Sequence, residues 1–211
     1  MGTIDSRYGG RMSDAFDFVL EPSDPAAWRI SADRVTATAP ARTDLFIDPS
    51  GTSGVAAESK LNAVTALGDP GAGDVVLSAR VRVGFLDTFD AGVLLVWVDE
   101  LHWAKLCFER SPAGERMVVS VVTRGTSDDA NGEVIDGDSV WLRVSRVGRM
   151  FAFHASTDGR SWRFARAFTL DGDEPARIGF EAQSPVGDGC EVAFDNLHFE
   201  RRTLGDLRDG R

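Results

Sequence analysis

The sequence predicts an all-β protein in which two antiparallel sheets pack face to face as a sandwich. Three observations predict this class. Apolar and polar residues alternate with a period of two along many segments, which is typical of half-buried strands. Glycine is abundant, with 22 residues among 211, and Asp-Gly and similar turn signals separate the alternating segments. No segment of about ten or more residues has the apolar spacing of a helix.

The first expected strands lie in the N-terminal third of the chain and are short. They carry β-branched, aromatic or alternating apolar residues, and Asp, Pro, Ser or Gly stands close to their ends. This composition is typical of strands between turns. These segments are residues 16–20, 28–30, 34–39, 43–48 and 62–67.

The central strands have the clearest patterns. Residues 75–83 alternate Val, Leu and Ala with more polar residues, which predicts a half-buried antiparallel strand. Residues 91–98 form the densest apolar run and predict a strand that is buried on both faces. Residues 103–109 place Ala, Leu and Phe on one side of a strand, and residues 117–123 are rich in valine.

Hairpins are expected in the C-terminal half of the chain. A two-residue connection, Gly148 and Arg149, joins one pair of alternating segments, and the Asp158-Gly159 turn precedes the next segment. The strands expected in this half are residues 140–147, 150–155, 161–168, 176–183 and 191–200.

The chain is expected to form one domain over residues 14–211, preceded by a flexible arm at residues 1–13. The arm is mostly small or polar, and no Pro- or Ser-rich linker divides the rest. No apolar run approaches the roughly 18–20 residues that cross a membrane, and the N-terminus lacks the apolar region of a secretory signal. These observations predict a cytoplasmic protein without a membrane partner.

The net charge limits the kinds of partner that the chain can have, and the number of cysteines indicates their redox state. The formal net charge is -10, from 33 acidic and 23 basic side chains. Proteins that bind nucleic acids hold the polyanion with an excess of Lys and Arg, so no nucleic-acid partner is expected. The two cysteines, Cys107 and Cys190, are too few for a disulfide framework and are expected to stay reduced. The sequence leaves open whether the two thiols meet in space.

Several segments occur in an order and spacing that resemble a known family. These segments are Trp28, 43–46 (TDLF), 90–94 (DAGVL), 102–105 (HWAK) with Glu109, 121–124 (VVTR) with Ser127 and Asp128, 141–144 (WLRV), 156–159 (STDG) with Trp162, 179–185 (GFEAQSP) with Gly189, and 207–210 (LRDG). Together they resemble the uncharacterised "regulation of enolase"-type proteins, a family of unknown function with a concanavalin A-like lectin/glucanase fold.

The resemblance runs from about Phe16 to the C-terminus and implies a concanavalin A-like jelly-roll sandwich. It implies little chemistry, because members of the family mostly lack an established activity. The chain departs from the family at Asp129, where an aromatic residue often follows the Ser-Asp pair. The resemblance therefore does not imply that this segment of the chain has the role that it has in the family.

Aromatic and polar side chains occupy alternate positions of several expected strands. The candidate ligand-binding residues are Trp97, Asp99, Trp103, Lys105, Glu109, Arg143, Glu181 and Gln183. An indole ring packs against the C–H face of a sugar, while carboxylate, amide, ammonium and guanidinium groups satisfy its hydroxyls. We therefore expect a saccharide or similar polyol to bind on the concave face of one sheet. The alternative is that these side chains form solvated cross-strand pairs without a ligand.

Two other classes of function are kept beside the non-catalytic binding module. A small glycoside hydrolase or lyase would use Glu109 as its acid or base, but hydrolysis needs a second carboxylate about 5–10 Å away. Strand 103–109 offers one acid, so Glu181 or Asp99 would have to approach from a neighbouring strand. A protein-interaction or regulatory module, which could form homo-oligomers, would use a sheet face or edge strands.

No metal or cofactor site is predicted. The cysteines and histidines lack zinc-ligand spacing, and no glycine-rich segment completes a phosphate-binding pattern. Residues 127–132 weakly resemble the start of a calcium-binding loop, because oxygen-bearing side chains occur at every second position, Ser127, Asp129 and Asn131. The first position lacks Asp and the twelfth is Asp138 instead of Glu, so a solvated polar loop is expected there.

Overall fold

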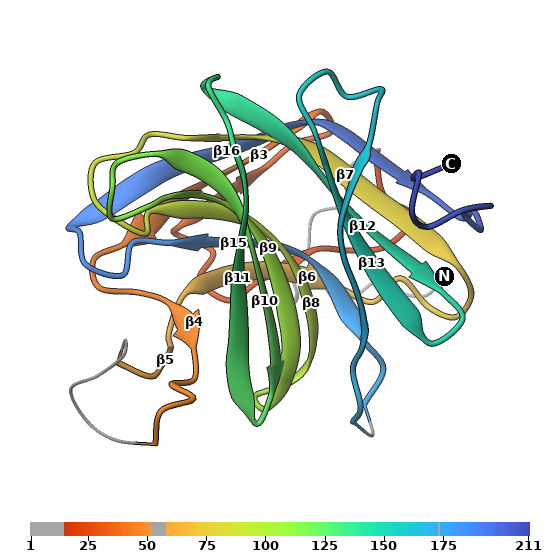
Figure 1. Cartoon of the computed structure of the whole chain (residues 1–211), viewed down its shortest axis with the longest axis horizontal. Helices are drawn as coiled ribbons and strands as arrows, with labels where there is room; N and C mark the ends of the chain where they lie inside the picture. Colours follow the sequence, from red (N-terminus) through yellow and green to blue (C-terminus); the bar gives the residue numbers. More distant parts are fainter. Residues whose placement is uncertain (1–14, 52–57, 173) are drawn as a thin grey trace, which may run out of the picture.

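Two seven-stranded antiparallel sheets pack face to face in the computed structural model of the chain (Figure 1). The structure describes residues 15–51, 58–172 and 174–211, so the arm predicted at residues 1–13 lies outside the described residues. The described part contains no helix, and hence no helix that could cross a membrane. The predicted class, an all-β sandwich of two antiparallel sheets, is confirmed.

The first sheet contains the strands from which the candidate site is built. Its strands, in spatial order, are β1 (Glu21–Pro22), β6 (Val64–Gly68), β15 (Arg177–Gln183), β8 (Ala91–Asp99), β9 (His102–Arg110), β10 (Arg116–Arg124) and β11 (Thr126–Val134). Strands β8 to β11 follow one another through tight connections, whereas β15 enters from the far end of the chain. This order sets β15 beside β8, with β9 as the next strand.

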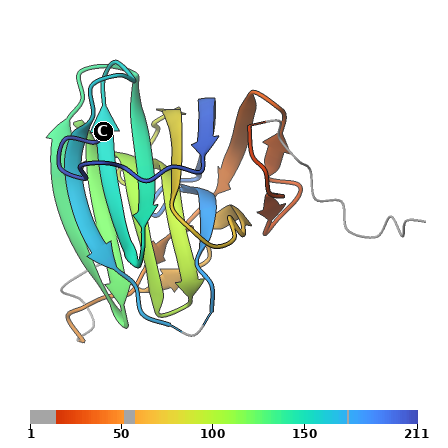
Figure 2. The same cartoon turned by 90° about the vertical axis from the view of Figure 1, so that its right-hand side faces the viewer.

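The second sheet forms the other layer, and Figure 2 shows the same sandwich turned by 90°. Its strands, in spatial order, are β14 (Arg163–Thr169), β13 (Met150–Ser156), β12 (Ser139–Val147), β7 (Val75–Val83), β16 (Gly189–Glu200), β3 (Arg34–Pro40) and β2 (Trp28–Ile30). Two further short strands, β4 (Leu45–Phe46) and β5 (Lys60–Leu61), pair with each other outside both sheets.

The core lies between the two sheets, where alternate side chains of the facing strands meet. Phe180 of β15 contacts Phe194 of β16, with ring centroids 4.6 Å apart, and Phe194 also stacks on Trp28. The sheets approach so closely at β8 that a Cβ atom on Gly92 would lie 2.5 Å from a methyl group of Val192. Close packing of this kind resists displacement. Strands β8 and β9 are therefore held firmly, and their outward-facing side chains have a rigid support.

The outer face of the first sheet is also largely covered. A second cluster of buried apolar side chains gathers there: Leu45, Leu67, Ala91, Val93, Leu95, Trp103, Cys107, Met117, Val119 and Val121. The segment that contains β4 is fastened to this face by β11. The backbone N–H of Ser127 donates to the carbonyl of Ile47, and the backbone N–H of Ile47 donates to Oγ of Ser127, both at 2.9 Å. Part of this face, including Trp103, consequently lies beneath a cover instead of in open solvent.

Charged side chains join the neighbouring edges of the two sheets. Arg166 of β14 forms an ion pair with Asp128 of β11 at 3.1 Å, and Arg163 pairs with Glu133. Arg124 of β10 donates a hydrogen bond to the carbonyl of Thr169 at 3.1 Å. These contacts close the sandwich along one side, where β11 has no further strand partner among the described residues.

Three expected elements differ from the structure. Residues 16–20 do not form a strand of their own: Phe16, Phe18 and Leu20 point into the core, as their alternation indicates, but the paired strand is β1. Residues 127–132 form part of β11 and not a loop. Backbone pairing to β10 defines this edge strand, and its exposed side chains need no apolar alternation. The expected strand at 43–48 is shortened to β4.

Candidate functional site

A pocket of about 740 Å³ lies on the outer face of the first sheet. Its polar surface comes from Asp44, Lys105, Glu109, Asp129 and Gln183. Its apolar walls come from Phe46, Pro49, Phe89, Val119, Val121, Pro185 and Val186, and its charged rim from Arg42, Glu58 and Lys60. The volume falls within the range of about 300–1,000 Å³ that is typical of small-molecule sites, as does the combination of apolar walls with a few polar groups.

Strand register brings the polar residues of the pocket together. Gln183 on β15 faces Ala91 on β8, which in turn faces Glu109 on β9. Lys105 faces Val121 on β10, and Val121 faces Asp129 on β11. Because side chains alternate along a strand, these residues all emerge from the outer face. Strands β15, β9 and β11 thus contribute their polar side chains to a single surface.

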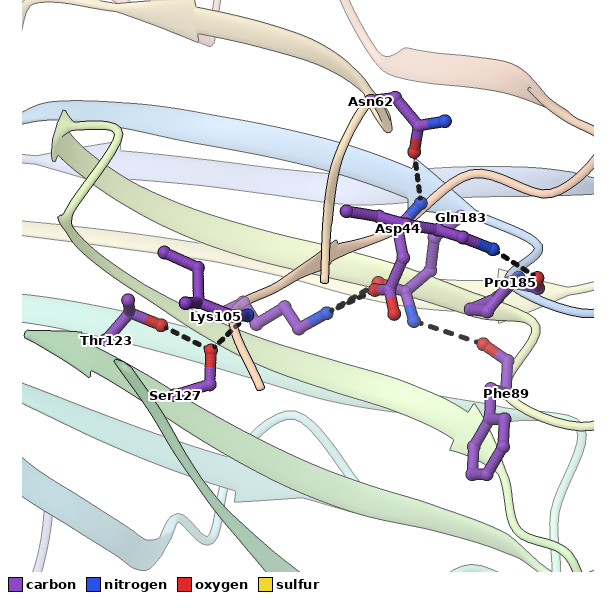
Figure 3. A network of polar contacts seen from close by, with 10 residues as sticks. Asp44, Asn62, Phe89, Lys105, Thr123, Ser127, Gln183 and Pro185 are labelled. Carbon is purple, nitrogen blue, oxygen red and sulfur yellow. Dashed lines mark hydrogen bonds and ion pairs between the residues drawn. The ribbon is translucent and has the colours of Figure 1, made fainter. Parts of the chain in front are cut away.

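Lys105 is the buried cation at the centre of this surface. Its side chain is almost fully enclosed, and its Nζ atom donates hydrogen bonds to Oδ1 of Asp44 at 2.9 Å and Oε1 of Gln183 at 2.7 Å (Figure 3). Burial by itself would lower the pKa of Lys105, but the attraction of nearby acidic groups, that of Asp44 above all, outweighs burial and raises it. Lys105 is therefore a permanent cation at physiological pH.

Backbone hydrogen bonds hold the segment that supplies Asp44. The Asp44 backbone N–H donates to Oδ1 of Asn62 at 3.0 Å (Figure 3). The backbone N–H of Asn62 donates back to the Asp44 carbonyl, also at 3.0 Å. Thr43 and Ser184 exchange two backbone hydrogen bonds of 3.2 Å each. The carboxylate that neutralises Lys105 is thus preorganised by backbone contacts.

Two glutamates near Lys105 favour their neutral form. Burial raises the pKa of Glu109 to about 8, and the charges of Asp44 and Glu181 add to this effect while Lys105 opposes it. Burial likewise raises the pKa of Glu181 to about 8. Glu181 has no exposed surface, and neither carboxyl oxygen has a hydrogen-bond partner among the described residues. Near neutral pH these groups are therefore largely protonated, and Glu109 presents an O–H donor to the pocket.

Phe89 forms part of the pocket wall in an unusual backbone conformation. Its φ angle is +67°, a region that a bulky side chain rarely adopts. The Phe89 carbonyl accepts a hydrogen bond from Nε2 of Gln183 at 3.1 Å, and its N–H donates to the carbonyl of Arg110 at 2.7 Å. Strained backbone of this kind persists where surrounding contacts enforce it, and it clusters at binding sites.

The aromatic platform predicted at Trp97 and Trp103 needs correction. The two indoles stack on each other, with centroids 6.5 Å apart and an interplanar angle of 9°. Trp103 has no exposed surface, and its Nε1 donates to the carbonyl of Glu100 at 3.2 Å, so it offers no ring face to a ligand. Asp99 lies at the β8–β9 turn, where its carboxylate contacts Nδ1 of His102 at 2.9 Å. None of these three predicted residues lines the pocket.

Arg143 also lies elsewhere. Its strand, β12, belongs to the second sheet, where Leu142 and Val144 point into the core and Arg143 points to the opposite outer face. The prediction that Arg143 shares a surface with Lys105 is therefore wrong, because the sandwich separates them. Of the eight predicted residues, Lys105, Glu109 and Gln183 line the pocket, and Glu181 lies buried beside Lys105.

Several pocket residues are absent from the sequence prediction. Asp44 and Phe46 stand in the 43–46 motif that supports the family resemblance, so a signal exists for them. Asp129 is visible in the sequence only as a departure from the family pattern. Phe89 gives no signal, because its role depends on a backbone conformation that the sequence does not reveal.

The fold and the pocket define a jelly-roll β-sandwich with a covered polar pocket on one outer face. Comparison with known protein families identifies the family of the chain. Residues 23–202 match the family described as "Protein of unknown function (DUF1349)", and the chain belongs to this family. A comparison with curated proteins found no match.

Solved structures share the fold. A functionally unknown protein from Saccharomyces cerevisiae is 21% identical, with a TM-score of 0.74, and the match covers 88% of this chain and 97% of that one. A GH43 protein, BlXynB, from Bacillus licheniformis is 12% identical with a TM-score of 0.67, covering 96% and 40% of the two chains. A xylan beta-1,4-xylosidase from Bacillus halodurans is 10% identical with a TM-score of 0.67, covering 93% and 38%. The chain thus corresponds to about two fifths of these two proteins.

Proposed function

We propose that the protein is a non-catalytic module that binds a saccharide or similar polyol in the pocket on the first sheet. The observation that carries this proposal is the combination of apolar walls with a prearranged polar floor. Phe46 and Phe89 form the aromatic walls, in place of the tryptophans expected from the sequence. The Lys105–Asp44–Gln183 network fixes hydrogen-bonding groups beneath them. Sugar rings are recognised by this pairing of aromatic faces with directed polar groups.

The hydrogen-bonding groups of the pocket suit hydroxyls more than a charged ligand. The lining contains three cations, Arg42, Lys60 and Lys105, beside acidic groups at Asp44, Glu58, Glu109 and Asp129. Asp129 offers acceptors, whereas protonated Glu109 offers a donor. A hydroxyl is both donor and acceptor, so a polyol can satisfy such mixed groups without bringing a charge of its own.

The test is a glycan array, screened with and without calcium, followed by calorimetry on each glycan that binds. Asp129→Ala removes a pocket carboxylate from an exposed position, so the fold should be preserved. We expect it to weaken binding at least about fivefold. Asp128→Ala is the matched control, because Asp128 points away from the pocket and pairs with Arg166. Absence of any bound glycan, or equal affinities for the two variants, would contradict the proposal.

A second candidate, a glycoside hydrolase or lyase, is favoured by one observation. Glu109 has a pKa of about 8 inside a pocket that also contains the carboxylates of Asp44 and Asp129. A raised carboxyl pKa next to an ionised carboxylate is the arrangement that general-acid catalysis needs. Incubation with aryl glycosides and with oligosaccharides distinguishes the candidates. Turnover that Glu109→Gln abolishes, with glycan binding retained, would establish the enzyme and overturn the non-catalytic module.

The cellular setting is part of the proposal. Cytoplasmic location is supported by the two cysteines, which are both free and buried. Cell fractionation with an antibody against the full chain tests it. The regulatory role and the homo-oligomer that the sequence leaves open stay predictions, and light scattering coupled to size-exclusion chromatography measures the oligomeric state.

A further inference from the structure

A second pocket, of about 330 Å³, lies on the outer face of the second sheet. Trp141 and Arg143 of β12 line it, together with Trp162 and with Glu200 and Arg202 near the end of β16. It is separate from the first pocket, because the two sheets and the core lie between them.

Arg143 is a buried cation that forms no ion pair within the described part of the chain. Its side chain is only 3% exposed, and no carboxylate among the described residues forms an ion pair with it. One nitrogen, Nη2, donates to the carbonyl of Gly210 at 2.8 Å, and the guanidinium lies 4.2 Å from the centre of the Trp162 ring. The Nε atom is enclosed, with no hydrogen-bond partner among the described residues. A buried cation normally has a partner, because removing a charge from water is costly unless a counter-charge compensates.

The arrangement around Arg143 leaves positive charge in excess. Glu200 is the acidic residue of the lining, and it is already engaged by Arg202 at 2.8 Å and by His198 at 3.6 Å. Burial, and then the neighbouring Arg202, lower the pKa of Arg143 to about 10, so it remains a cation at neutral pH. The pocket is therefore lined by two guanidiniums and one carboxylate, and that carboxylate pairs with Arg202 and not with Arg143, in a protein whose net charge is -10.

The C-terminal segment gives this site its shape. It crosses the outer face of β12 and β13 (Figure 2), where the carbonyl of Leu207 contacts Nε2 of His154 at 2.6 Å. Gly210 has a φ of +73°, and a Cβ atom there would lie 2.3 Å from Nη2 of Arg143. Glycine suits this position, because it accepts the positive φ without strain and a side chain there would displace the guanidinium from its place beside the Gly210 carbonyl. Arg143 is thus held in one orientation, which reduces the entropy that a ligand would have to remove.

We propose that this second pocket binds a small organic oxyanion, a carboxylate or phosphate carried on a sugar-sized ring. The oxyanion would bind between Arg143 and Arg202, since guanidinium groups match the geometry of carboxylate and phosphate oxygens. The half-buried indoles of Trp141 and Trp162 supply apolar surface for the ring that carries the anion. Sugar carboxylates and sugar phosphates share this chemistry, and the experiment separates them.

The test is calorimetric titration of the full chain with glucuronate, glucose 6-phosphate, glucose and inorganic phosphate. We expect one or both ring anions to bind, with glucose at least about tenfold weaker because it brings no charge to Arg143. The identity of the tighter ring anion distinguishes a carboxylate from a phosphate site. The proposal is overturned if neither ring anion binds, or if inorganic phosphate binds as tightly as both of them.

Three variants locate the binding. Arg202→Ala changes an exposed residue, so it should fold normally, and we expect it to weaken anion binding at least about fivefold. Arg143→Gln should weaken it more, and circular dichroism checks its fold. Arg149→Ala removes the same charge from the exposed β12–β13 turn and should bind like the wild type. Equal affinity of Arg202→Ala and Arg149→Ala would place the anion elsewhere and overturn the proposal. Asp129→Ala, in the first pocket, should leave anion binding unchanged.

Discussion

The two outer faces of the sandwich each bury one cation, but they compensate it differently. Lys105 on the first sheet is neutralised within the chain, by Asp44 at 2.9 Å and by an amide oxygen of Gln183. Arg143 on the second sheet has an aromatic ring and a backbone carbonyl, but no carboxylate pairs with it among the described residues. The buried cation of the first pocket is therefore paired within the chain, whereas that of the second retains an unpaired charge.

This difference separates the kinds of ligand that each face suits. A cation that is already paired presents fixed dipoles, which favour a neutral molecule rich in hydroxyls. An unpaired cation favours a molecule that brings the missing negative charge. The same fold thus presents two surfaces with different chemistry, and four measurements test whether the difference in pairing is its cause.

The largest effect is expected from Lys105→Met. The substitution leaves Asp44 as a buried, unpaired carboxylate beside Glu181, which should lower the free energy of unfolding by about 3–5 kcal/mol. Urea denaturation at pH 7 measures it. Lys60→Met is the control, because Lys60 lies on the pocket rim and its ion-pair partner is the exposed Glu58 at 3.6 Å. If both variants lose equally little stability, the pairing of Lys105 does not distinguish the two faces.

The second-largest effect on the free energy of unfolding is expected from a change in pH. The ordinary pKa of a glutamate is 4.5, and burial raises that of Glu181 to about 8. Between these values the folded protein retains a proton that the unfolded chain has lost, so the free energy of unfolding falls as the pH rises. From Glu181 we expect a loss of about 4 kcal/mol between about pH 5 and about pH 8.5.

Glu181→Gln isolates the contribution of Glu181. Glutamine resembles the neutral glutamic acid, so the variant should match the wild type at about pH 5 and exceed its stability at about pH 8.5. Thermal unfolding over a pH series follows the difference. Glu115→Gln, an exposed change, should leave the profile as it is. A Glu181→Gln profile as steep as that of the wild type would show that Glu181 is ionised throughout.

Phe89 offers a smaller and more specific test of the first face. Phe89→Gly and Phe89→Ala both remove the aromatic wall, and both should weaken glycan binding at least about fivefold. Glycine accepts a φ of +67° without strain, whereas alanine does not, so the glycine variant should be more stable by about 1 kcal/mol. Denaturant midpoints and calorimetry provide the two readouts. Alanine and glycine variants of equal stability would show that the backbone there is unstrained.

The smallest effect is expected from Arg143→Met. Loss of the ring contact and of one hydrogen bond is offset by removal of an unpaired buried charge, so stability should change by less than about 1 kcal/mol. The contrast with Lys105→Met is the direct measure of the difference between the faces. A loss as large as that of Lys105→Met would mean that Arg143 is fully compensated in the folded protein.

Alternation along the strands predicts most of the fold. It assigns Lys105 and Glu109 to one side of β9, and Glu181 and Gln183 to one side of β15, as the register confirms. It fails at β11, because an edge strand with exposed polar side chains has no apolar period. At residues 16–20 the alternation is present but predicts a strand that does not form, since side chains can alternate into the core without a paired backbone.

The candidate site is predicted less completely, because a pocket depends on which strands become neighbours. Periodicity shows that Arg143 points out of the core, but not that β12 belongs to the other sheet. Trp103 shares a face with Lys105, yet the cover formed by the β4 segment buries part of that face. Neither fact is local in sequence. The contribution of Asp44 likewise depends on its own contacts with Asn62 and on those of Thr43 with Ser184, far along the chain.

The charged edge at β11 has a consequence for how copies of the chain meet in concentrated solution. An unpaired edge strand is a template for a second copy, and such pairing extends a sheet from one molecule to the next. Here Asp128, Asp129 and Glu133 would bring like charges together in an antiparallel pair, and Arg163 and Arg166 already hold two of these acids against β14. Growth of the sheet along β11 is thereby disfavoured, so this edge resists aggregation without the need for a further covering element.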